Sequence, residues 1–319
     1  MTPPGRPPGD RPQQRLDWAL AELHRQGHTV QAVSEPAYKA WSVIVRLLTP
    51  DGPVYLKYVR GAFLHEPGLT RALHRLAPDH LPDILADNPD LGCWLVGDGG
   101  AALVPRVLAD DGHVPRLMTA HAALQRATLG DAGSWLALGA KDVRPDRWAG
   151  FLDDILAATG ALTLDKVTQP VLTGLAAARD PLARLAARVA ALNPPMTVVH
   201  LDLRRVNIRI RRGRVRVIDW GDAGFGPALL DPVPLLSELA QMGLAETQMQ
   251  AVRAAHLAPW DGHATDDLQQ IAAACRTAFP LIYAHGLIHA RPSWDATLKP
   301  TFYGLLQGYL SIFLERLSA

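Results

Sequence analysis

The chain has 319 residues, 48% of them hydrophobic, which is enough to bury a large core in two lobes or two domains. Its 32 lysines and arginines nearly balance its 31 aspartates and glutamates, so the composition gives no reason to expect nucleic acid or an anionic membrane as a partner. The two cysteines predict no disulfide framework. No apolar run has the length of a membrane span or the form of a signal peptide, so we expect a cytoplasmic protein.

The N-terminal part of the chain begins with a proline-rich stretch and continues with a helix and strands. Residues 1–13 hold five prolines and two glycines, which predicts a disordered tail. Apolar residues recur at helical spacing over residues 14–26. Three strands are predicted next, at 28–33, 40–48 and 54–59.

The third strand carries Lys57 among apolar neighbours. A lone lysine on a strand is usually solvated, whereas one between apolar positions can face a binding site. A helix is predicted after it, ending near Pro78, and Glu66 is its only acidic candidate. Because Pro67 suits a first helical turn, Glu66 should lie at the start of that helix.

The loop between the first two strands is Ser34 to Lys39 and contains no glycine. Ser34 is either a phosphate ligand or a turn residue. Two further strands are predicted at 84–86 and 93–96. The rest of the chain is mostly helical, with helices predicted at 116–129, 146–158, 167–179, 180–192, 231–242, 246–256, 264–285 and 299–317.

The stretch Val199 to Asp222 follows the pattern strand, polar loop, hairpin, acidic loop. A hairpin with its turn at Arg212-Gly213 would bring Asn207 and Asp219 side by side, with Asp202 nearby. Oxygen donors in this arrangement suit Mg²⁺. Five arginines alternate with apolar residues along the hairpin and are expected to form its solvated face: Arg209, Arg211, Arg212, Arg214 and Arg216.

These residues carry a family resemblance. His200-x-Asp202-x-x-x-x-Asn207, followed by Asp219-Trp220-Gly221-Asp222, resembles the catalytic and metal-binding loops of the aminoglycoside phosphotransferase family. That family is a small-molecule branch of the protein-kinase-like fold. Its usual form is close to HGDLHPGN, whereas this chain has HLDLRRVN.

The resemblance implies an α+β, protein-kinase-like two-lobed fold, with a small antiparallel-sheet N-lobe at residues 14–100 and a mostly helical C-lobe at 101–319. The segment from Trp94 to Gly100 resembles the family's hinge between the lobes. Since backbone groups of that hinge bind adenine in the family, the base site is expected at Leu95, Val96, Gly97 and Asp98.

The resemblance also implies a reaction: transfer of the γ-phosphoryl group of ATP, with GTP possible, to a hydroxyl group. Asp202 would orient the hydroxyl and accept its proton, and Asn207 and Asp219 would hold Mg²⁺. Lys57, held by Glu66, would bind the phosphates. Arg204 either touches the transferred group or is an exposed side chain. His200 is expected to brace the loop.

The acceptor is expected to be a small molecule, with no nucleic acid, membrane or obligate protein partner. Only eleven residues separate Asp219 from Asp231, which leaves no room for the activation segment that protein kinases use to bind peptide. Residues 232–319 hold seven acidic and five basic residues, which does not favour a polycationic aminoglycoside. Choline, homoserine and fructosamine-type sugars are alternatives.

Two other functions fit parts of the pattern. A pseudokinase would keep the fold and bind nucleotide with weak catalysis, and the absence of a glycine-rich loop favours it. A metal-dependent hydrolase would use the same oxygen cluster without ATP, but would have no need of Lys57 or of a hinge.

Overall fold

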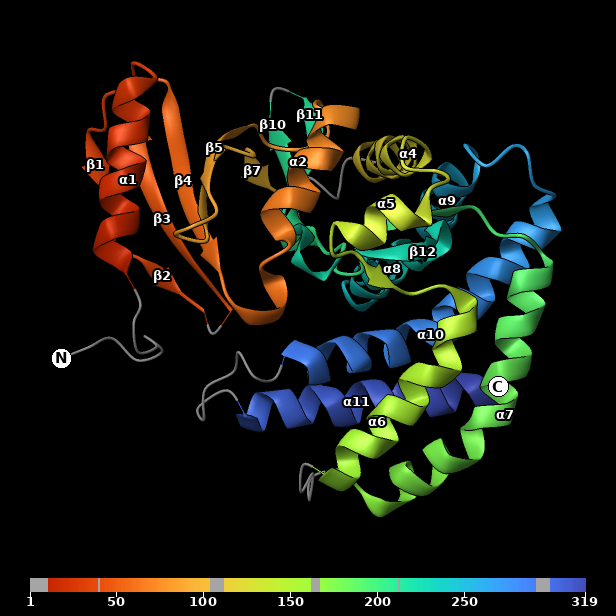
Figure 1. Ribbon diagram of the computed structural model, residues 1–319. Coiled ribbons are helices and arrows are strands. Elements are labelled where there is room, and N and C mark those ends of the chain that lie inside the picture. The colour runs from red at the N-terminus through yellow and green to blue at the C-terminus, as the bar shows by residue number, and fades with distance from the viewer. Residues whose placement is uncertain (1–10, 40, 104–111, 162–166, 212, 291–298) are drawn as a thin grey trace.

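The computed structural model describes residues 11–39, 41–103, 112–161, 167–211, 213–290 and 299–319. It has the protein-kinase-like architecture expected from the sequence, with a β-rich N-terminal lobe beside a larger helical body (Figure 1). Residues 1–10 of the predicted tail lie outside the described residues. Pro12 and Gln13, also assigned to that tail, instead begin the first helix, because proline is well tolerated in a first helical turn.

The N-lobe is one antiparallel sheet in the order β1-β3-β4-β6-β5, with β2 also paired to β3. The strands are β1 Ala32–Val33, β2 Ala37–Tyr38, β3 Ser42–Thr49, β4 Gly52–Val59, β5 Ile84–Asn88 and β6 Cys93–Gly97. The β3–β4 turn is Pro50-Asp51 rather than the Asp51-Gly52 that the sequence favours, because Gly52, with a φ of +119°, already pairs with Thr49. The predicted first strand is shortened to two exposed residues at the sheet edge.

Helix α1 (Pro12–Arg25) covers one face of this sheet. Its Ala19 and Leu23 are fully buried in a cluster with apolar residues of β3, β4 and β6. Helix α2 (Glu66–Leu76) behaves differently, because its Leu69 and Leu73 belong to a cluster with C-lobe residues such as Trp220. The cores of the two lobes therefore meet at α2.

The link between the lobes is a short turn that requires glycine. Strand β7 (Ala101–Ala102) already pairs with β10 of the C-lobe. At Gly100, φ is +104° and a Cβ would lie 2.3 Å from the carbonyl oxygen of Ile210. No larger residue fits there without moving the backbone.

The hairpin β10 (Ile208–Arg211) and β11 (Arg214–Val217) forms as predicted, with Ile208 opposite Val217. Its arginines do not form a purely solvated face. Arg211 Nη1 donates to the Asp98 carbonyl at 2.8 Å, and Arg216 lies 3.7 Å from Asp83, so this face ties the hairpin to the N-lobe. Arg212 lies outside the described residues.

A second small sheet, in the order β8-β12-β9, supports the loops after β9 (Met196–Val199). Neither β8 (Lys141–Asp142) nor β12 (Gly224–Pro227) is predicted from the sequence. Both are too short for an alternating pattern, and β12 is rich in glycine because its Gly226 packs against Val143, where a Cβ would be 2.7 Å away.

The helices of the C-lobe follow the predicted periodicity, with two differences. The segments 167–179 and 180–192 form one helix, α7, with Pro181 inside it. Its buried stripe, from Leu175 to Val189, continues on both sides of the proline, and this burial offsets the roughly 3 kcal/mol that an interior proline costs. Helix α10, predicted to end at 285, continues to Ala290, with Pro280 inside it as predicted.

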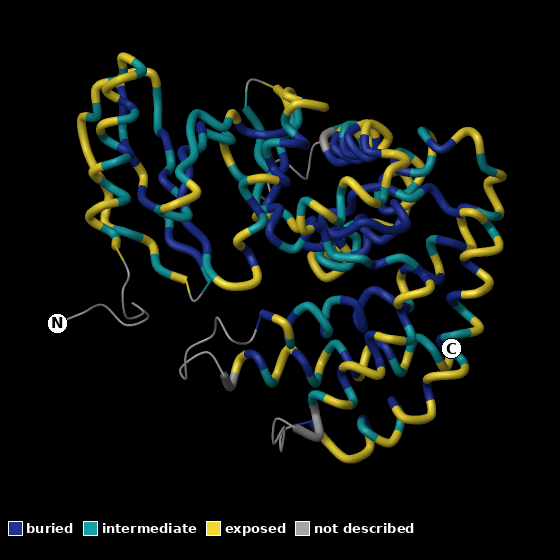
Figure 2. The backbone as a smooth tube through the Cα atoms, viewed as in Figure 1, coloured by how far each residue is buried: buried dark blue, intermediate teal, exposed yellow. Residues whose placement is uncertain are grey.

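The C-lobe helices fall into two groups (Figures 1 and 2). Around the catalytic loops lie α4 (His113–Arg126), α5 (Ala132–Ala137), α8 (Pro232–Gln241) and α9 (Glu246–Leu257). The helical layer below them consists of α6 (Trp148–Ala161), α7 (Gln169–Ala191), α10 (Thr265–Ala290) and α11 (Lys299–Ser318). The sequence favours packing roles for four tryptophans of this lobe: Trp148, Trp220 and Trp260 are buried, and Trp294 lies outside the described residues.

Helix α10 corrects one expectation from the sequence. By length and composition alone its 26 residues meet the criterion for a membrane-spanning helix. In the structure, 56% of the relevant window is buried inside the protein, where α10 packs against α6, α7 and α11. Such burial is typical of a central core helix.

Candidate active site

The catalytic loop begins directly after β9, in a strained backbone conformation. Leu201 has a φ of +62°, in the left-handed region, at the position where the phosphotransferase pattern has glycine. Its N–H donates to Asp231 Oδ1 at 2.8 Å, and its side chain is buried. These two contacts hold a conformation that costs leucine about 1 kcal/mol or more.

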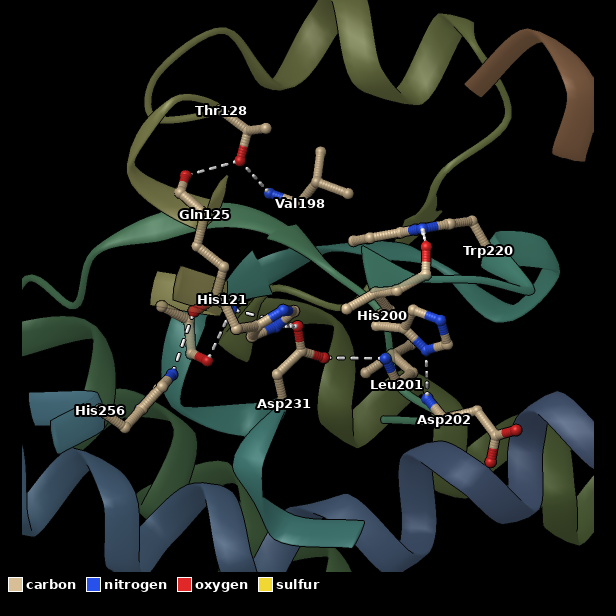
Figure 3. A network of polar contacts seen from close by, with 12 residues as sticks. His121, Gln125, Thr128, Val198, His200, Leu201, Asp202, Trp220, Asp231 and His256 are labelled. Atoms are coloured by element: carbon tan, nitrogen blue, oxygen red, sulfur yellow. Dashed lines mark hydrogen bonds and ion pairs between the residues drawn. The ribbon is translucent and has the colours of Figure 1, made fainter. Parts of the chain in front are cut away.

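Asp231 is the centre of a buried polar network beneath this loop (Figure 3). Its Oδ2 accepts from His121 Nε2 at 2.8 Å and from Gln125 Nε2 at 3.1 Å. Burial alone would raise the pKa of Asp231, but the hydrogen bond and charge of His121 lower it. At the far end, His256 Nε2 lies 3.1 Å from Gln125 Oε1, and burial lowers the pKa of His256 to about 3.

His200 joins the two functional loops. Its Nε2 lies 2.9 Å from the carbonyl oxygen of Ile218, which can only accept a hydrogen bond, so Nε2 carries the proton. Its Nδ1 accepts from the backbone N–H of Asp202 at 3.2 Å. With both nitrogens engaged, His200 has no lone pair for general-base action in this geometry.

Asp202 is 8% exposed and paired with Arg204. Arg204 Nε donates to Oδ1 at 2.6 Å and Nη2 to Oδ2 at 3.0 Å, a bidentate contact. Asn207 Nδ2 also donates to Asp202 Oδ2 at 2.9 Å. Burial raises the pKa of Asp202, although Arg204 opposes the shift.

Lys57 pairs with Glu66 of its own lobe and with Asp219 of the C-lobe. Its Nζ lies 2.5 Å from Glu66 Oε1 and 2.6 Å from Asp219 Oδ1. Glu66 is in the first turn of α2, as its position before Pro67 predicts. Burial alone would lower the pKa of Lys57, but the negative charges of Asp219 and Glu66 raise it. Burial alone would raise the pKa of Asp219, but the charge and hydrogen bond of Lys57 lower it to about 2.

Asn207 and Asp219 are brought together by the hairpin, as the spacing predicts. The N–H of Ile218 donates to the Asn207 carbonyl at 2.9 Å. Since Nδ2 of Asn207 donates to Asp202 and Oδ1 of Asp219 accepts from Lys57, the two side chains offer Asn207 Oδ1 and Asp219 Oδ2 to a cation. Amide and carboxylate oxygens are the donors that Mg²⁺ prefers, so this pair fits it.

A cleft of about 300 Å³ between the lobes leads to these side chains. Ile44, Val96 and Ile218 form apolar parts of its wall, Lys57 and Asp219 lie at one end, and Asp98 lies at the hinge. This combination of an apolar slot with a charged end fits a nucleotide.

The predicted base site is only partly on the wall of this cleft. Val96, Gly97 and Asp98 line it, but the Leu95 side chain is fully buried in the N-lobe core, because alternate strand residues face opposite sides of the sheet. The Gly97 N–H donates to the Asp83 carbonyl at 2.7 Å.

Lys39, which directly follows β2, lies near the phosphate end, whereas Ser34 does not. Ser34 Oγ accepts from the Arg46 N–H at 3.0 Å, so it acts as a strand-end residue. Lys39 lines the cleft, and its charge helps to lower the pKa of Asp219. Lys39 was not predicted as a site residue, although a lysine at the end of a glycine-free loop is a visible signal.

A second cavity, of about 240 Å³, meets the cleft at the catalytic loop. Five residues line both: Lys39, Glu66, Val206, Asn207 and Asp219. Asp202 and Arg204 line the second cavity. The remaining wall includes aromatic and aliphatic side chains that the sequence did not single out, namely Trp41, Phe63, Ile282, Tyr283, Leu287, Leu305 and Tyr309.

Charges in the second cavity are balanced. Asp222 accepts from Lys141 Nζ at 2.8 Å. The sequence could not reveal this pairing, because Lys141 lies on the unpredicted strand β8. Arg204 pairs with Asp202, and Lys57 pairs with both Glu66 and Asp219. Each carboxylate on the described cavity wall therefore has a cationic partner.

Comparison with known proteins assigns this architecture to a class. A sequence model of the phosphotransferase enzyme family matches residues 39–271. The chain belongs to this family, which comprises small-molecule phosphotransferases that act on hydroxyl groups. No curated protein sequence matched.

Solved structures share the fold over nearly the whole chain. Macrolide 2'-phosphotransferase type I aligns with a TM-score of 0.63 and 17% identity, covering 91% of this chain and 96% of the other. Choline kinase from Cryptosporidium parvum Iowa II aligns with a TM-score of 0.67 and 11% identity over 94% and 95%. Spectinomycin phosphotransferase APH(9)-Ia, in complex with ADP and spectinomycin, gives 0.54 and 10% over 95% and 98%.

Proposed function

We propose that this protein transfers the γ-phosphoryl group of ATP to a hydroxyl group of a small molecule in a Mg²⁺-dependent reaction. The observation that carries the proposal is the convergence of Asp202, Asn207, Asp219 and Lys57 at the place where the two cavities meet. The inter-lobe cleft is then the nucleotide site, and the second cavity is the acceptor site.

Each residue has a role that follows from its contacts. Asn207 and Asp219 would hold Mg²⁺, which when bound neutralises charge on the phosphates. Lys57, fixed by Glu66, would bind the phosphates that are not transferred. Asp202 would orient the acceptor hydroxyl and take its proton, a task to which burial contributes by raising the pKa of its carboxyl group.

Arg204 would serve both ends of the transfer. Its side chain lines the acceptor site and is 45% exposed while it holds Asp202. A permanent cation at that point suits the transferred phosphoryl group. When Arg204 turns toward phosphate, it releases Asp202 Oδ1 and Oδ2 for the acceptor hydroxyl.

The acceptor site favours an uncharged or weakly charged alcohol with an apolar body. Its carboxylates are already paired, so a polycation would find no unpaired partner on the described wall. Val206 and Leu305 line the site and are 50% and 40% exposed, a surface that an apolar acceptor would cover.

A thermal-shift titration tests the nucleotide site without knowledge of the acceptor. ATP should stabilise the protein by about 2.7 kcal/mol at a hundred times its dissociation constant, and more with Mg²⁺ than without. GTP is run in parallel. Asp219→Asn should remove the Mg²⁺ dependence, whereas Asp202→Asn should leave nucleotide binding intact. Absence of any shift with either nucleotide would contradict the proposal.

Transfer of radiolabelled phosphate then tests the acceptor. A macrolide, which has a large apolar body and one basic amine, is compared with choline and a polycationic aminoglycoside, and the macrolide should be the best of the three. Preference for the aminoglycoside would refute the charge argument. Nucleotide binding without transfer to any acceptor, in wild type as in Asp202→Asn, would favour the pseudokinase alternative.

A further inference from the structure

Three potential metal ligands converge between α6 and α10 in the helical layer. His285 and His289 lie on α10, and Asp154 lies on α6. One atom from each side chain can be chosen so that all three lie within 4.8 Å of one another. Neither proposed cavity includes any of these three residues in its wall.

The local structure explains the convergence. Positions four apart on a helix share one face, so His285 and His289 project together. The ring of His285 packs against Phe151 of α6, with centroids 4.3 Å apart, which fixes its orientation. Phe151 is three residues before Asp154, so the same face of α6 presents the carboxylate to the imidazoles.

The contacts point to a shared positive ion. His285 Nε2 lies 3.1 Å from Asp154 Oδ2 and 3.0 Å from His289 Nε2. One N–H of His285 can serve both contacts only as a three-centre bond. A metal ion between the three atoms would instead accept a lone pair from each of them.

We propose that Asp154, His285 and His289 form a site for a divalent transition-metal ion of the Zn²⁺ type. Two imidazoles and one carboxylate are a common ligand set for Zn²⁺, with water completing the shell, whereas Mg²⁺ prefers oxygen donors alone. The site is therefore chemically distinct from the Asn207–Asp219 pair. A bound ion would join α6 to α10, whose Tyr283 and Leu287 line the acceptor site.

Zn²⁺ titration of the chelator-treated protein by calorimetry tests the site, with thermal shift as a second measurement. We expect one Zn²⁺ per chain, and at least tenfold weaker binding in His289→Ala, which removes an exposed side chain and should leave the fold intact. His28→Ala is the matched control, because His28 lies 3.5 Å from Asp51 but belongs to no such cluster among the described residues.

Two further measurements locate the ion. Asp219→Asn should leave Zn²⁺ binding unchanged, and Co²⁺ should give a visible spectrum of a low-coordinate nitrogen and oxygen site that His289→Ala abolishes. Failure to bind Zn²⁺, or binding that survives His289→Ala, would overturn the proposal. Loss of binding in Asp219→Asn would assign the ion to the catalytic loops instead. None of these outcomes depends on phosphoryl transfer.

Discussion

Replacing Asp231 by Asn tests whether the buried network holds the catalytic loop. The wild-type carboxylate is fully buried and accepts three hydrogen bonds, from Leu201 N–H, His121 and Gln125. An asparagine amide has one acceptor oxygen, so in either orientation its NH₂ group faces at least one donor. Each hydrogen bond to a charged group contributes about 1.5–3 kcal/mol, and an unmatched buried donor costs about 1–3 kcal/mol.

We therefore expect Asp231→Asn to lower the free energy of unfolding by about 2–4 kcal/mol in urea denaturation. The pH dependence gives a second readout. Because the folded-state pKa of Asp231 is lowered, its contribution is present above the unfolded pKa near 3.9 and is lost as the pH falls below that value. The variant should lose less stability than wild type below pH 4.

Asp261→Asn is the matched control, since that side chain is 83% exposed and should change stability by no more than about 0.5 kcal/mol. If Asp231→Asn is as stable as this control, the network does not hold the loop. If the variant is destabilised but its stability depends on pH below 4 as that of wild type does, Asp231 is not ionised in the folded protein.

Three other changes test separate parts of the structure. Lys57→Met should weaken ATP binding at least tenfold in calorimetry and destabilise the protein, because Glu66 and Asp219 lose their shared partner. Adding Glu66→Gln should restore stability but not ATP binding. Recovery of both would contradict the role of Lys57. In urea denaturation, Gly100→Ala should destabilise the protein by about 2 kcal/mol or more, because the added Cβ meets the Ile210 carbonyl. Gly68→Ala in α2, which has open space around it, should instead stabilise the protein by up to about 1 kcal/mol in the same assay. The wild-type protein should lose stability as the pH falls from about 6.5 to 3, because its unfolded state binds a proton at His256 that the folded state excludes. His256→Asn should reduce this loss. An unchanged slope of unfolding free energy against pH would show that His256 titrates normally.

Local patterns in the sequence were sufficient to predict which side chains of the two loops come together. The spacing of Asp202, Asn207 and Asp219 predicts their convergence, because a hairpin has a fixed pairing geometry and the turn at Gly213 sets its register. The helical stripes were also readable, since burial of one face imposes a period near four residues.

Proline was a less reliable signal of where a helix ends, and very short strands gave no signal. Pro181 predicts a boundary between two helices, but the continuous buried stripe of α7 offsets the local cost. Strands β8 and β12 were missed, since two to four residues between packed elements carry no period of their own.

Long-range pairing was decided by the tertiary structure alone. Lys141 and Arg211 are ordinary charged residues in the sequence, and their partners lie 81 and 113 positions away along the chain. The family resemblance predicts that Asp231 braces the loop, but not that it accepts from Leu201, 30 positions away. The same holds for the acceptor wall on α10 and α11, and for the meeting of Asp154 with His285. Neighbours along the chain determine which groups a loop presents, whereas the packing of distant elements determines which charges are neutralised and therefore what each cavity can bind.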